Sequence, residues 1–452
     1  MLTKTKQPAA VSAFVDLRLQ REHQARKQES KKTTKRKDEK RTGRDGRAVI
    51  QRCCCSLIPV GLAALRETCG HALSTILQAL AAASRDDKDG RPAVLDIAVA
   101  VSGKGKPFGL LQRFLADIYR LLAVVSVAAS VELDGPGGVD ARVFFVDLDG
   151  QAAGDDDDDD DACAYGPIID VKCLMRSNRS WDTVYLASGC ERAASFAAML
   201  SARETADNRI KTANVRTLDL KTPGEKPSTG LVLSQGTAPP AAAAAHSSVA
   251  VGGTFDHLHA GHKLLLTATV LALDTCPSLS QPARRDGQEK RVVTVGITGD
   301  ELLVNKKYAE FLESWEDRWQ GVWRFLQSIT DFSPSSTVDV RRENEPGPNG
   351  RRAIVSLSPG LEFRFVQIAD PFGPTITDRD ITALVVSKET RSGGQAVNDE
   401  RLKKGWSALE VFEVDVLDTA DAVSASEDSF ESKISSTAIR RRRMNLAKGS
   451  SL

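Results

Sequence analysis

One short stretch of the chain is rich in histidine and glycine and also contains a threonine: Gly252-Gly-Thr-Phe-Asp-His-Leu-His-Ala-Gly-His262. An apolar run ends at its two glycines, and an apolar helical pattern begins directly after His262. This order predicts a strand, a tight loop and the N-terminus of a helix. Unpaired backbone N–H groups and the positive end of the helix dipole favour an anion there, and glycine lets it approach the backbone closely. The stretch therefore predicts a phosphate site.

Two further stretches carry groups of the same kind. Asn305-Lys-Lys307 follows an expected strand and places ammonium groups at the same edge of a sheet, and Lys433-Ile-Ser-Ser-Thr-Ala-Ile-Arg440 brings hydroxyls to a second expected helix N-terminus. Cations and hydrogen-bond donors predominate over carboxylates in these loops. That balance favours phosphoryl or nucleotidyl transfer, in which the protein positions two anions and stabilises charge on the reacting phosphorus. It disfavours a hydrolase, because no Ser-His-acid or Cys-His arrangement is visible.

The elements that must position these loops alternate between strands and helices from about residue 248 onward. Such alternation predicts a parallel sheet with helices on both faces, a doubly wound, Rossmann-like α/β fold. Ligands of such sheets bind at the carboxyl ends of strands, near the point where the strand order reverses. We expect strands at 291–297, 361–368, 381–386 and 409–416, helices at 263–273 and 310–329, and surface insertions at 277–290, 333–360 and 418–432.

The first half of the chain predicts a separate α/β domain over residues 48–235. An acidic insertion at 151–162, with an unbroken run of aspartates, is expected to lie extended on its surface. The sequence assigns no role to this domain. Its expected helices lie at 57–82 and 108–130, and its expected strands at 93–101, 142–148 and 183–187.

Two polar segments flank these parts. Residues 1–47 are dominated by Lys, Arg, Gln and Glu and predict a disordered basic tail, with a nuclear address as the alternative interpretation. Residues 236–247 are low in complexity and predict a linker. A catalytic domain would then occupy 248–445, followed by a tail at 446–452.

Composition sets limits on the class of protein. A chain of 452 residues is long enough for two or three domains. Its net charge of +1 averages a basic head and an acidic middle and so argues neither for nor against nucleic acid, which is not an expected partner. The eight cysteines show no paired metal-binding spacing, which favours a reduced, cytoplasmic chain with a nuclear location as the alternative. No apolar run approaches the roughly 20 residues of a membrane span.

The histidine loop, together with Ile434-Ser-Ser-Thr437, resembles the nucleotidylyltransferase superfamily, whose signatures are H-x-G-H and an I-S-S-T type loop. Gly299–Tyr308, Asp370–Thr377 and Leu384–Thr390 narrow this to a resemblance to the eukaryotic-type, fungal-like pantetheine-phosphate adenylyltransferase, over about 248–445. The resemblance implies attack of the phosphate of 4′-phosphopantetheine on the α-phosphorus of ATP, giving dephospho-coenzyme A and pyrophosphate. It also implies that Mg²⁺ assists together with ATP, and it assigns no metal ligand in the protein.

The resemblance also implies roles for single residues. His262 would stabilise the transition state and Lys306 would hold the two reacting phosphates together. The residues implied in ATP binding are Gly253, Thr254, Phe255, His259, Gly261, His262, Ser435, Ser436 and Thr437. The residues implied in binding 4′-phosphopantetheine are Thr254, Asp256, Lys306, Arg318 and Lys388.

Other interpretations stay open. A different nucleotidylyltransferase, acting on nicotinamide mononucleotide or with CTP, is disfavoured by Thr254-Phe-Asp256 and by Asp370–Thr377. Alternatively, residues 48–235 serve as a scaffold that recruits other coenzyme A enzymes.

The bacterial pantetheine-phosphate adenylyltransferases carry an arginine-rich loop where this chain has Ser387-Lys-Glu-Thr-Arg391. Tryptophans at 315, 319 and 323 are expected in the core, and Arg440–Arg443 at a basic helix end.

Overall fold

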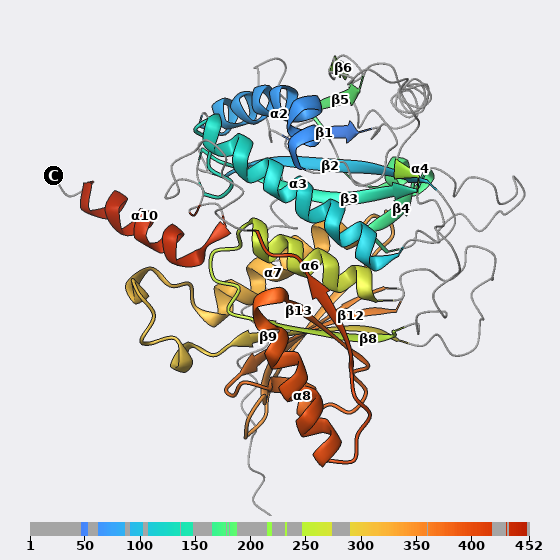
Figure 1. Ribbon diagram of the computed structural model, residues 1–452, viewed down its shortest axis with the longest axis vertical. Coiled ribbons are helices and arrows are strands. Elements are labelled where there is room, and N and C mark those ends of the chain that lie inside the picture. Colours follow the sequence, from blue (N-terminus) through green and yellow to red (C-terminus); the bar gives the residue numbers. More distant parts are fainter. Residues whose placement is uncertain are drawn as a thin grey trace, which may run out of the picture. The chain divides into compact units, whose positions relative to one another are not determined.

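Two β-sheets with their helices make up the part of the chain that the structure describes (Figure 1). The fold is mixed α/β, as expected, and most strand pairs are parallel. The predicted basic tail, acidic insertion and most of the linker lie outside the described residues. The structure is a computed structural model and describes residues 47–52, 62–85, 91–102, 107–135, 137–147, 165–177, 179, 181–187, 215–218, 231–232, 246–273, 290–358, 360–417, 431 and 434–449.

The N-terminal sheet has the order β4-β3-β2-β1-β5-β6, with β7 paired to β2. All of these pairs are parallel. Helices α2 (Leu62–Arg85) and α3 (Phe108–Ala128) pack against each other, which confirms the two helices predicted here. The strands are β1 (Arg47–Arg52), β2 (Ala93–Ser102), β3 (Val139–Asp147), β4 (Ile168–Asp170), β5 (Thr183–Ala187), β6 (Val215–Leu218) and β7 (Leu231–Val232), and the short helix α4 (Val171–Arg176) follows β4.

The C-terminal sheet has the order β10-β11-β12-β9-β8-β13-β14. The pairs from β12 to β14 are parallel, and the two pairs that involve β11 are antiparallel. The predicted surface insertion at 333–360 is therefore wrong in part, because β11 carries Ala353, Val355 and Leu357 into the core. The strands are β8 (Ser248–Gly253), β9 (Arg291–Thr298), β10 (Val338–Asn344), β11 (Arg351–Leu357), β12 (Leu361–Ile368), β13 (Ala383–Ser387) and β14 (Glu410–Val414).

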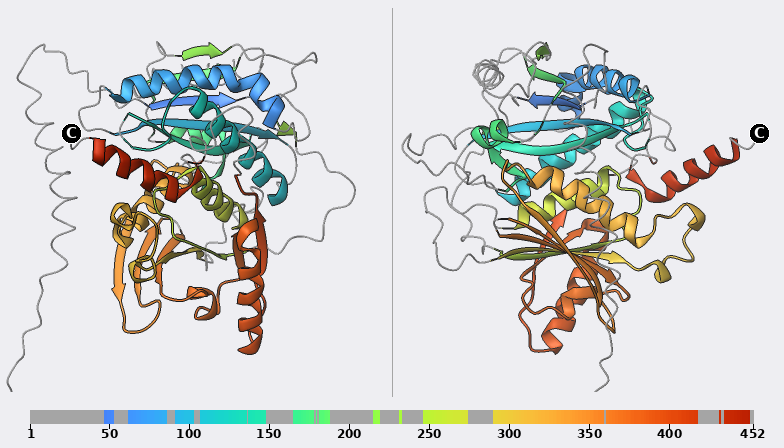
Figure 2. Two further views of the ribbon diagram at one scale, coloured as in Figure 1. Left: turned by 60° about the vertical axis from the view of Figure 1, so that its left-hand side comes forward. Right: turned by 180° about the vertical axis from the view of Figure 1, so that it is seen from behind.

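Helices cover both faces of the C-terminal sheet. Helices α6 (Ala260–Ala272) and α7 (Trp315–Thr330) lie between the two sheets, whereas α8 (Arg391–Lys403) lies on the opposite face (Figures 1 and 2). Trp319 and Trp323 pack against Phe363 and Phe365, which confirms that the tryptophan stripe belongs to the core. A last helix, α10 (Ser436–Gly449), runs past the predicted domain end at 445.

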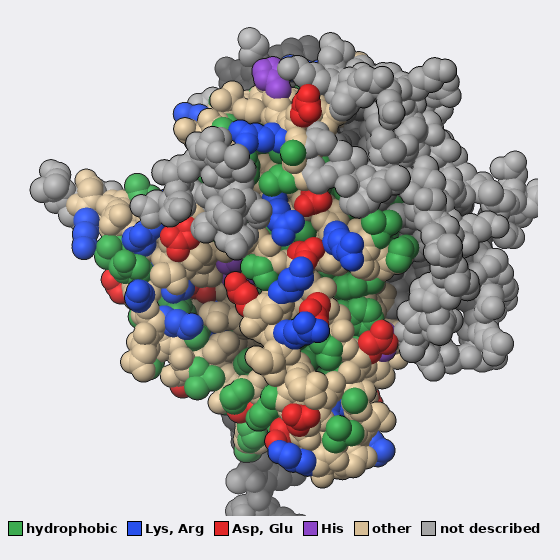
Figure 3. Space-filling model, in the orientation of Figure 1, with side chains coloured by type: hydrophobic (Ala, Val, Ile, Leu, Met, Phe, Trp, Pro, Cys, Tyr) green, Lys and Arg blue, Asp and Glu red, His purple; other side chains and the backbone are tan. Residues whose placement is uncertain are grey.

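The two halves share buried apolar surface. Helix α3 contacts α6, and α7 contacts β3, so one continuous apolar cluster includes residues of both sheets. The boundaries predicted for two separate domains stay a prediction. On the face seen in Figure 3, acidic and basic side chains are interspersed. Among the described helices, none is both long enough and apolar enough to cross a membrane.

Candidate functional site

The predicted histidine loop connects β8 to α6. Phe255 and His257 adopt positive φ angles of 51° and 46°, a left-handed conformation that is uncommon outside glycine. The Phe255 ring is buried beneath Gly253, where an added Cβ would lie 3.0 Å from the ring. Gly253 therefore permits the tight return of the chain, and Phe255 is placed in the core. Whether either of them contacts ATP stays a prediction.

The H-x-G-H spacing has a local structural reason. His259 caps α6, because its Nδ1 accepts a hydrogen bond from the backbone N–H of His262 at 3.4 Å. The two rings stack with their centroids 3.8 Å apart. A Cβ at Gly261 would lie 3.3 Å from the His259 ring, so the glycine between them leaves room for the cap. The spacing thus fixes both imidazoles at the helix N-terminus.

Both imidazoles are neutral at pH 7. Burial lowers the pKa of His262 to about 3, and it lowers the pKa of His259 well below its ordinary value. The Nδ1 atom of His262 is buried and has no hydrogen-bond partner among the described residues. A neutral imidazole carries one donor and one acceptor, and a phosphate beside it would favour the protonated ring. His262 is therefore arranged to respond to an anion.

Arg440 joins three of the predicted stretches. It is 2% exposed, and its guanidinium pairs with Asp256 of the histidine loop. Its Nε donates to the carbonyl of Lys307 at 3.0 Å, and its Nη2 donates to Oγ1 of Thr437 at 3.2 Å. The histidine loop, the loop of Lys306 and the start of α10 therefore meet. The sequence predicts only a basic helix end for Arg440, although this residue lies one turn after the hydroxyl cluster.

The hydroxyls of the I-S-S-T stretch make local contacts at this junction. Ser436 Oγ donates to the carbonyl oxygen of Asp256 at 2.7 Å, which ties α10 to the histidine loop. Ser435 Oγ accepts from the backbone N–H of Ala438 at 3.4 Å and so caps α10. Gly261 lies beside Ile434, since a Cβ added at Gly261 would be 3.9 Å from the carbonyl oxygen of Ile434. The two helix N-termini are neighbours.

Two residues predicted to bind substrate are buried. Asp256 is fully buried, and Arg318 is 1% exposed. Arg318 donates to the carbonyls of Thr254 (2.7 Å) and Glu313 (3.0 Å) and pairs with Asp300 at 2.6 Å. The observed contacts of Arg318 therefore hold the loops after β8 and β9 together. Contact of either residue with a substrate stays a prediction.

His257 lies in the interior rather than in a solvent-facing turn. It is 3% exposed; its Nδ1 lies 3.2 Å from a Glu313 carboxylate oxygen, and its Nε2 lies 2.7 Å from the carbonyl of Phe311. Burial opposes protonation of His257, but the hydrogen bond and charge of Glu313 outweigh it and raise its pKa. Asp256, His257 and Glu313 lie close enough to hold a metal ion. Because Asp256 pairs with Arg440, and Glu313 with His257, we interpret the trio as an internal ion network.

The predicted lysines are exposed. The backbone N–H of Lys306 donates to the carbonyl of Leu303 at 3.0 Å and closes a turn. The side chain of Lys306 is exposed to solvent. Lys388 follows β13 and pairs with Asp415, and Arg391 pairs with Glu413 at 2.8 Å. Roles in substrate binding for these cations stay predictions.

The Asp370–Thr377 stretch is a braced loop at the carboxyl end of β12. Oδ1 of Asp370 accepts from the backbone N–H groups of Phe372 (2.8 Å) and Gly373 (2.7 Å). Arg401 of α8, 2% exposed, donates to the carbonyls of Thr375, Asp378, Arg379, Ile381 and Ser407. Arg401 is not predictable from the sequence, because its partners are backbone atoms that no side-chain motif reveals.

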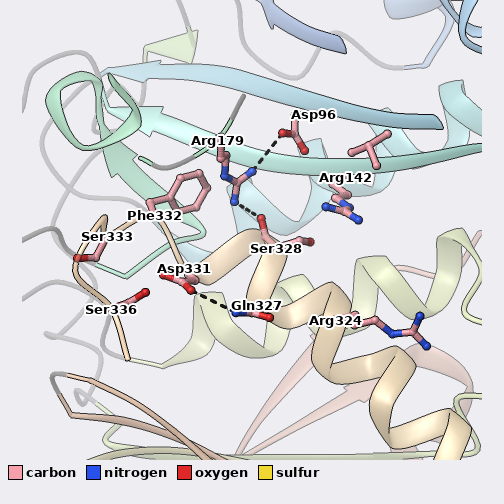
Figure 4. Close-up of a pocket in the computed structure, with 11 residues that line it drawn as sticks. Asp96, Arg142, Arg179, Arg324, Gln327, Ser328, Asp331, Phe332, Ser333 and Ser336 are labelled. Atoms are coloured by element: carbon pink, nitrogen blue, oxygen red, sulfur yellow. Dashed lines mark hydrogen bonds and ion pairs between the residues drawn. The ribbon is translucent and has the colours of Figure 1, made fainter. Parts of the chain in front are cut away.

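A cavity of about 350 Å³ lies between β2, β3 and the end of α7 (Figure 4). Arg142, Arg179 and Arg324 surround it. Arg179 pairs with Asp96 at 3.2 Å and lies over the Phe332 ring at 3.9 Å. None of the residues predicted for the phosphate site line this cavity.

The chain is similar to several known proteins. Residues 57–221 match the family described as a domain of unknown function, DUF8446. The chain is 38% identical to an uncharacterized protein of Schizosaccharomyces pombe, over 44% of this chain and 48% of that protein. It is 35% identical to the phosphopantetheine adenylyltransferase of Saccharomyces cerevisiae, over 42% of this chain and 47% of that protein.

A shorter relative is matched over most of its length. The chain is 29% identical to the phosphopantetheine adenylyltransferase of Pyrobaculum aerophilum, over 43% of this chain and 90% of that protein. By contrast, the chain spans about half the length of the Schizosaccharomyces and Saccharomyces relatives. A solved structure of a protein of unknown function from Archaeoglobus fulgidus is 24% identical and covers 37% of this chain and 89% of that chain. Its TM-score of 0.24 is too low to bear on the fold.

Proposed function

We propose that the chain is a nucleotidyltransferase that moves the adenylyl group of ATP to 4′-phosphopantetheine, giving dephospho-coenzyme A and pyrophosphate. The observation that carries the proposal is the junction at Arg440, where the histidine loop, the Lys306 loop and the N-terminus of α10 meet. Two adjacent helix N-termini suit the phosphates of two substrates. The relatives named phosphopantetheine adenylyltransferase support the choice of the acceptor.

The strand order supports a nucleotide site at this place. When the antiparallel strands β10 and β11 are left out, the strands β12-β9-β8-β13-β14 have the order 3-2-1-4-5 counted along the chain, which is the order expected of a doubly wound sheet. The order reverses between β8 and β13, and ligands of such sheets bind at the carboxyl ends of strands beside that point. The histidine loop follows the carboxyl end of β8.

The side chains suggest a division of labour. His262 would give a hydrogen bond to a phosphate and gain positive charge as negative charge grows on the reacting group, because its ring is neutral beforehand. Lys306 would hold the attacking phosphate beside the α-phosphate. Bringing two reactants together in the right geometry can remove roughly 7–11 kcal/mol of the barrier. Ser435, Ser436 and the start of α10 would face ATP.

Magnesium would enter this site with ATP. It usually binds through substrate phosphates and a few carboxylates and keeps several waters. The Asp256–His257–Glu313 trio does not fit a resident metal, because the Arg440 guanidinium already pairs with Asp256 and the Glu313 carboxylate lies 3.2 Å from the His257 ring. When bound, the ion supplies neutralisation of phosphate charge.

The test is pyrophosphate release by the purified full chain with ATP and 4′-phosphopantetheine. Nicotinamide mononucleotide with ATP, and phosphocholine with CTP, serve as competing substrate pairs. We expect release only with phosphopantetheine, and turnover about 100- to 1000-fold lower in His262→Ala. His71→Ala removes an exposed histidine of α2 and is the matched control. Turnover with another pair, or normal turnover in His262→Ala, would contradict the proposal.

A further inference from the structure

Helix α6, which begins within the H-x-G-H motif, is bound to the N-terminal sheet through Lys263, the residue that follows His262. The Nζ of Lys263 lies 2.6 Å from Oδ1 of Asp140 and 3.1 Å from the carbonyl oxygen of Ala141, both on β3. Lys263 is 6% exposed, so this contact is largely removed from water. Burial opposes ionisation of Asp140, but Lys263 and Arg142 outweigh it and hold its pKa well below the ordinary value. Asp140 is therefore charged at neutral pH.

Helix α10 is fastened to the same part of the chain. Arg442 pairs with Glu132 and, at 2.7 Å, with Asp134, and Arg443 lies 3.6 Å from Asp134. These acids lie between the end of α3 and the start of β3. Arg442 is two residues beyond Arg440, so α10 is bound to the histidine loop and to the N-terminal half within one turn.

The segment that carries these acids is itself tightly folded. The backbone N–H of Val139 donates to the carbonyl of Glu132 at 2.8 Å. An added Cβ at Gly138 would lie 2.4 Å from the carbonyl oxygen of Asp134, so the turn requires glycine at this position. Glu132, Asp134 and Asp140 therefore belong to one tightly folded segment. Their carboxylates contact α6 and α10, the two helices whose N-termini form the candidate site.

We propose that the N-terminal half is a positioning element, in which the 132–140 segment holds the N-termini of α6 and α10 in register for phosphate binding. This inference rests on the proposed function for its consequence in catalysis. Lys263, Asp140 and Arg442 are positioning residues in this view, since each acts through a helix that carries the phosphate-binding groups. Displacement of reacting groups by about 1 Å can cost roughly 100-fold in rate, so such tethers matter. The region matched as DUF8446 contains the segment and thereby gains a role.

The experiment uses the full chain and hydrogen–deuterium exchange of the peptides that cover Ala260–Leu264 and Ser436–Arg440. Asp140→Asn removes the charge that pairs with Lys263, and Arg442→Gln removes the tether of α10. Because Asp140→Asn leaves the buried Lys263 ammonium unpaired, Asp140→Asn/Lys263→Met removes that charge as well. Arg142, which also pairs with Asp140 at 2.7 Å, is partly exposed, so its charge can be solvated in the double variant. Tyr165→Phe is the matched control, because it deletes another hydrogen bond between the halves, from Tyr165 Oη to the carbonyl of Leu357 at 2.9 Å.

We expect faster exchange at α6 in both Asp140 variants and at α10 in Arg442→Gln, with the Kd for ATP raised roughly tenfold, as for one lost charged hydrogen bond. Tyr165→Phe should leave the exchange of both helices and the Kd unchanged. Unchanged exchange at α6 in the folded double variant, or equal effects in Tyr165→Phe, would overturn the proposal. A wild-type chain that fails to release pyrophosphate with phosphopantetheine would overturn the proposed function instead, because the exchange measurement needs no turnover.

Discussion

Replacing Arg440 should remove the junction of the candidate site. Arg440→Met keeps the apolar stem of the side chain but leaves the fully buried carboxylate of Asp256 without its ion pair. The hydrogen bonds to Lys307 and Thr437 are lost with it. Removing one partner of a buried ion pair costs about 3–5 kcal/mol, so we expect the free energy of unfolding to fall by about that amount.

A double variant separates stability from the geometry of the site. Asp256→Asn/Arg440→Met removes both charges of this pair, and the asparagine can still accept the hydrogen bond that Glu313 N–H gives to Asp256 at 2.9 Å. Most of the lost stability should therefore return, because the unpaired carboxylate is its main cause. Turnover should stay low, because the hydrogen bond by which Arg440 links the Lys307 loop to α10 is still missing.

Urea unfolding and pyrophosphate release measure the two effects. Arg441→Met is the matched control: Arg441 is half-exposed and lies 3.6 Å from Glu431, so its loss should change the unfolding free energy by less than about 1 kcal/mol. Equal destabilisation by Arg440→Met and Arg441→Met would refute the buried junction. Full turnover in the double variant would refute its role in the site.

Three more predictions concern the surroundings of the site. His257→Asn should flatten the pH dependence of stability above pH 6.5. Glu313 raises the folded pKa of His257, so the stabilisation that the protonated ring provides is fully present below the ordinary pKa of about 6.5 and is lost as pH rises through the folded pKa. Urea unfolding at pH 6 and pH 8 measures this difference. Gly261→Ala should stabilise α6 by up to about 1 kcal/mol in thermal unfolding. It should nevertheless raise the KM for ATP, because the new Cβ would press on the His259 ring; an unchanged KM would contradict that contact. Arg401→Met should lower the unfolding free energy by about 3 kcal/mol, because five carbonyls lose a charged donor, and a change below about 1 kcal/mol would contradict this bracing.

The histidine loop was predictable because its determinants are local. Two glycines after an apolar run, and a histidine three residues before another, specify a turn and a cap within a few residues. The parallel strands were predictable for a similar reason, since buried strands read as short β-branched runs. Helix α8 was not predicted: its sequence is polar, and Gly394, Val397 and Arg401 are its only buried residues.

The partners of buried arginines were beyond prediction from one sequence. Arg440 and Asp256 are far apart along the chain, and nothing in either neighbourhood indicates that they pair. Arg318 was predicted as a substrate contact, yet its observed partners are two carbonyls and Asp300. A guanidinium presents five donors in a fixed geometry, so it can replace several separate backbone contacts. Such a role depends on which loops the fold brings together.

The run Arg440–Arg443 shows why charge pattern alone is a poor guide to function. The four arginines contact four acidic residues in the structure: Arg440 pairs with Asp256, Arg441 with Glu431, Arg442 with Glu132 and Asp134, and Arg443 also with Asp134. Successive residues of a helix point in directions about 100° apart, so four adjacent cations can reach separate neighbours. The run therefore joins the histidine loop, Glu431 and the N-terminal half through one helix. A change at Glu132 or Asp134 should consequently reach the candidate site without altering any residue in it.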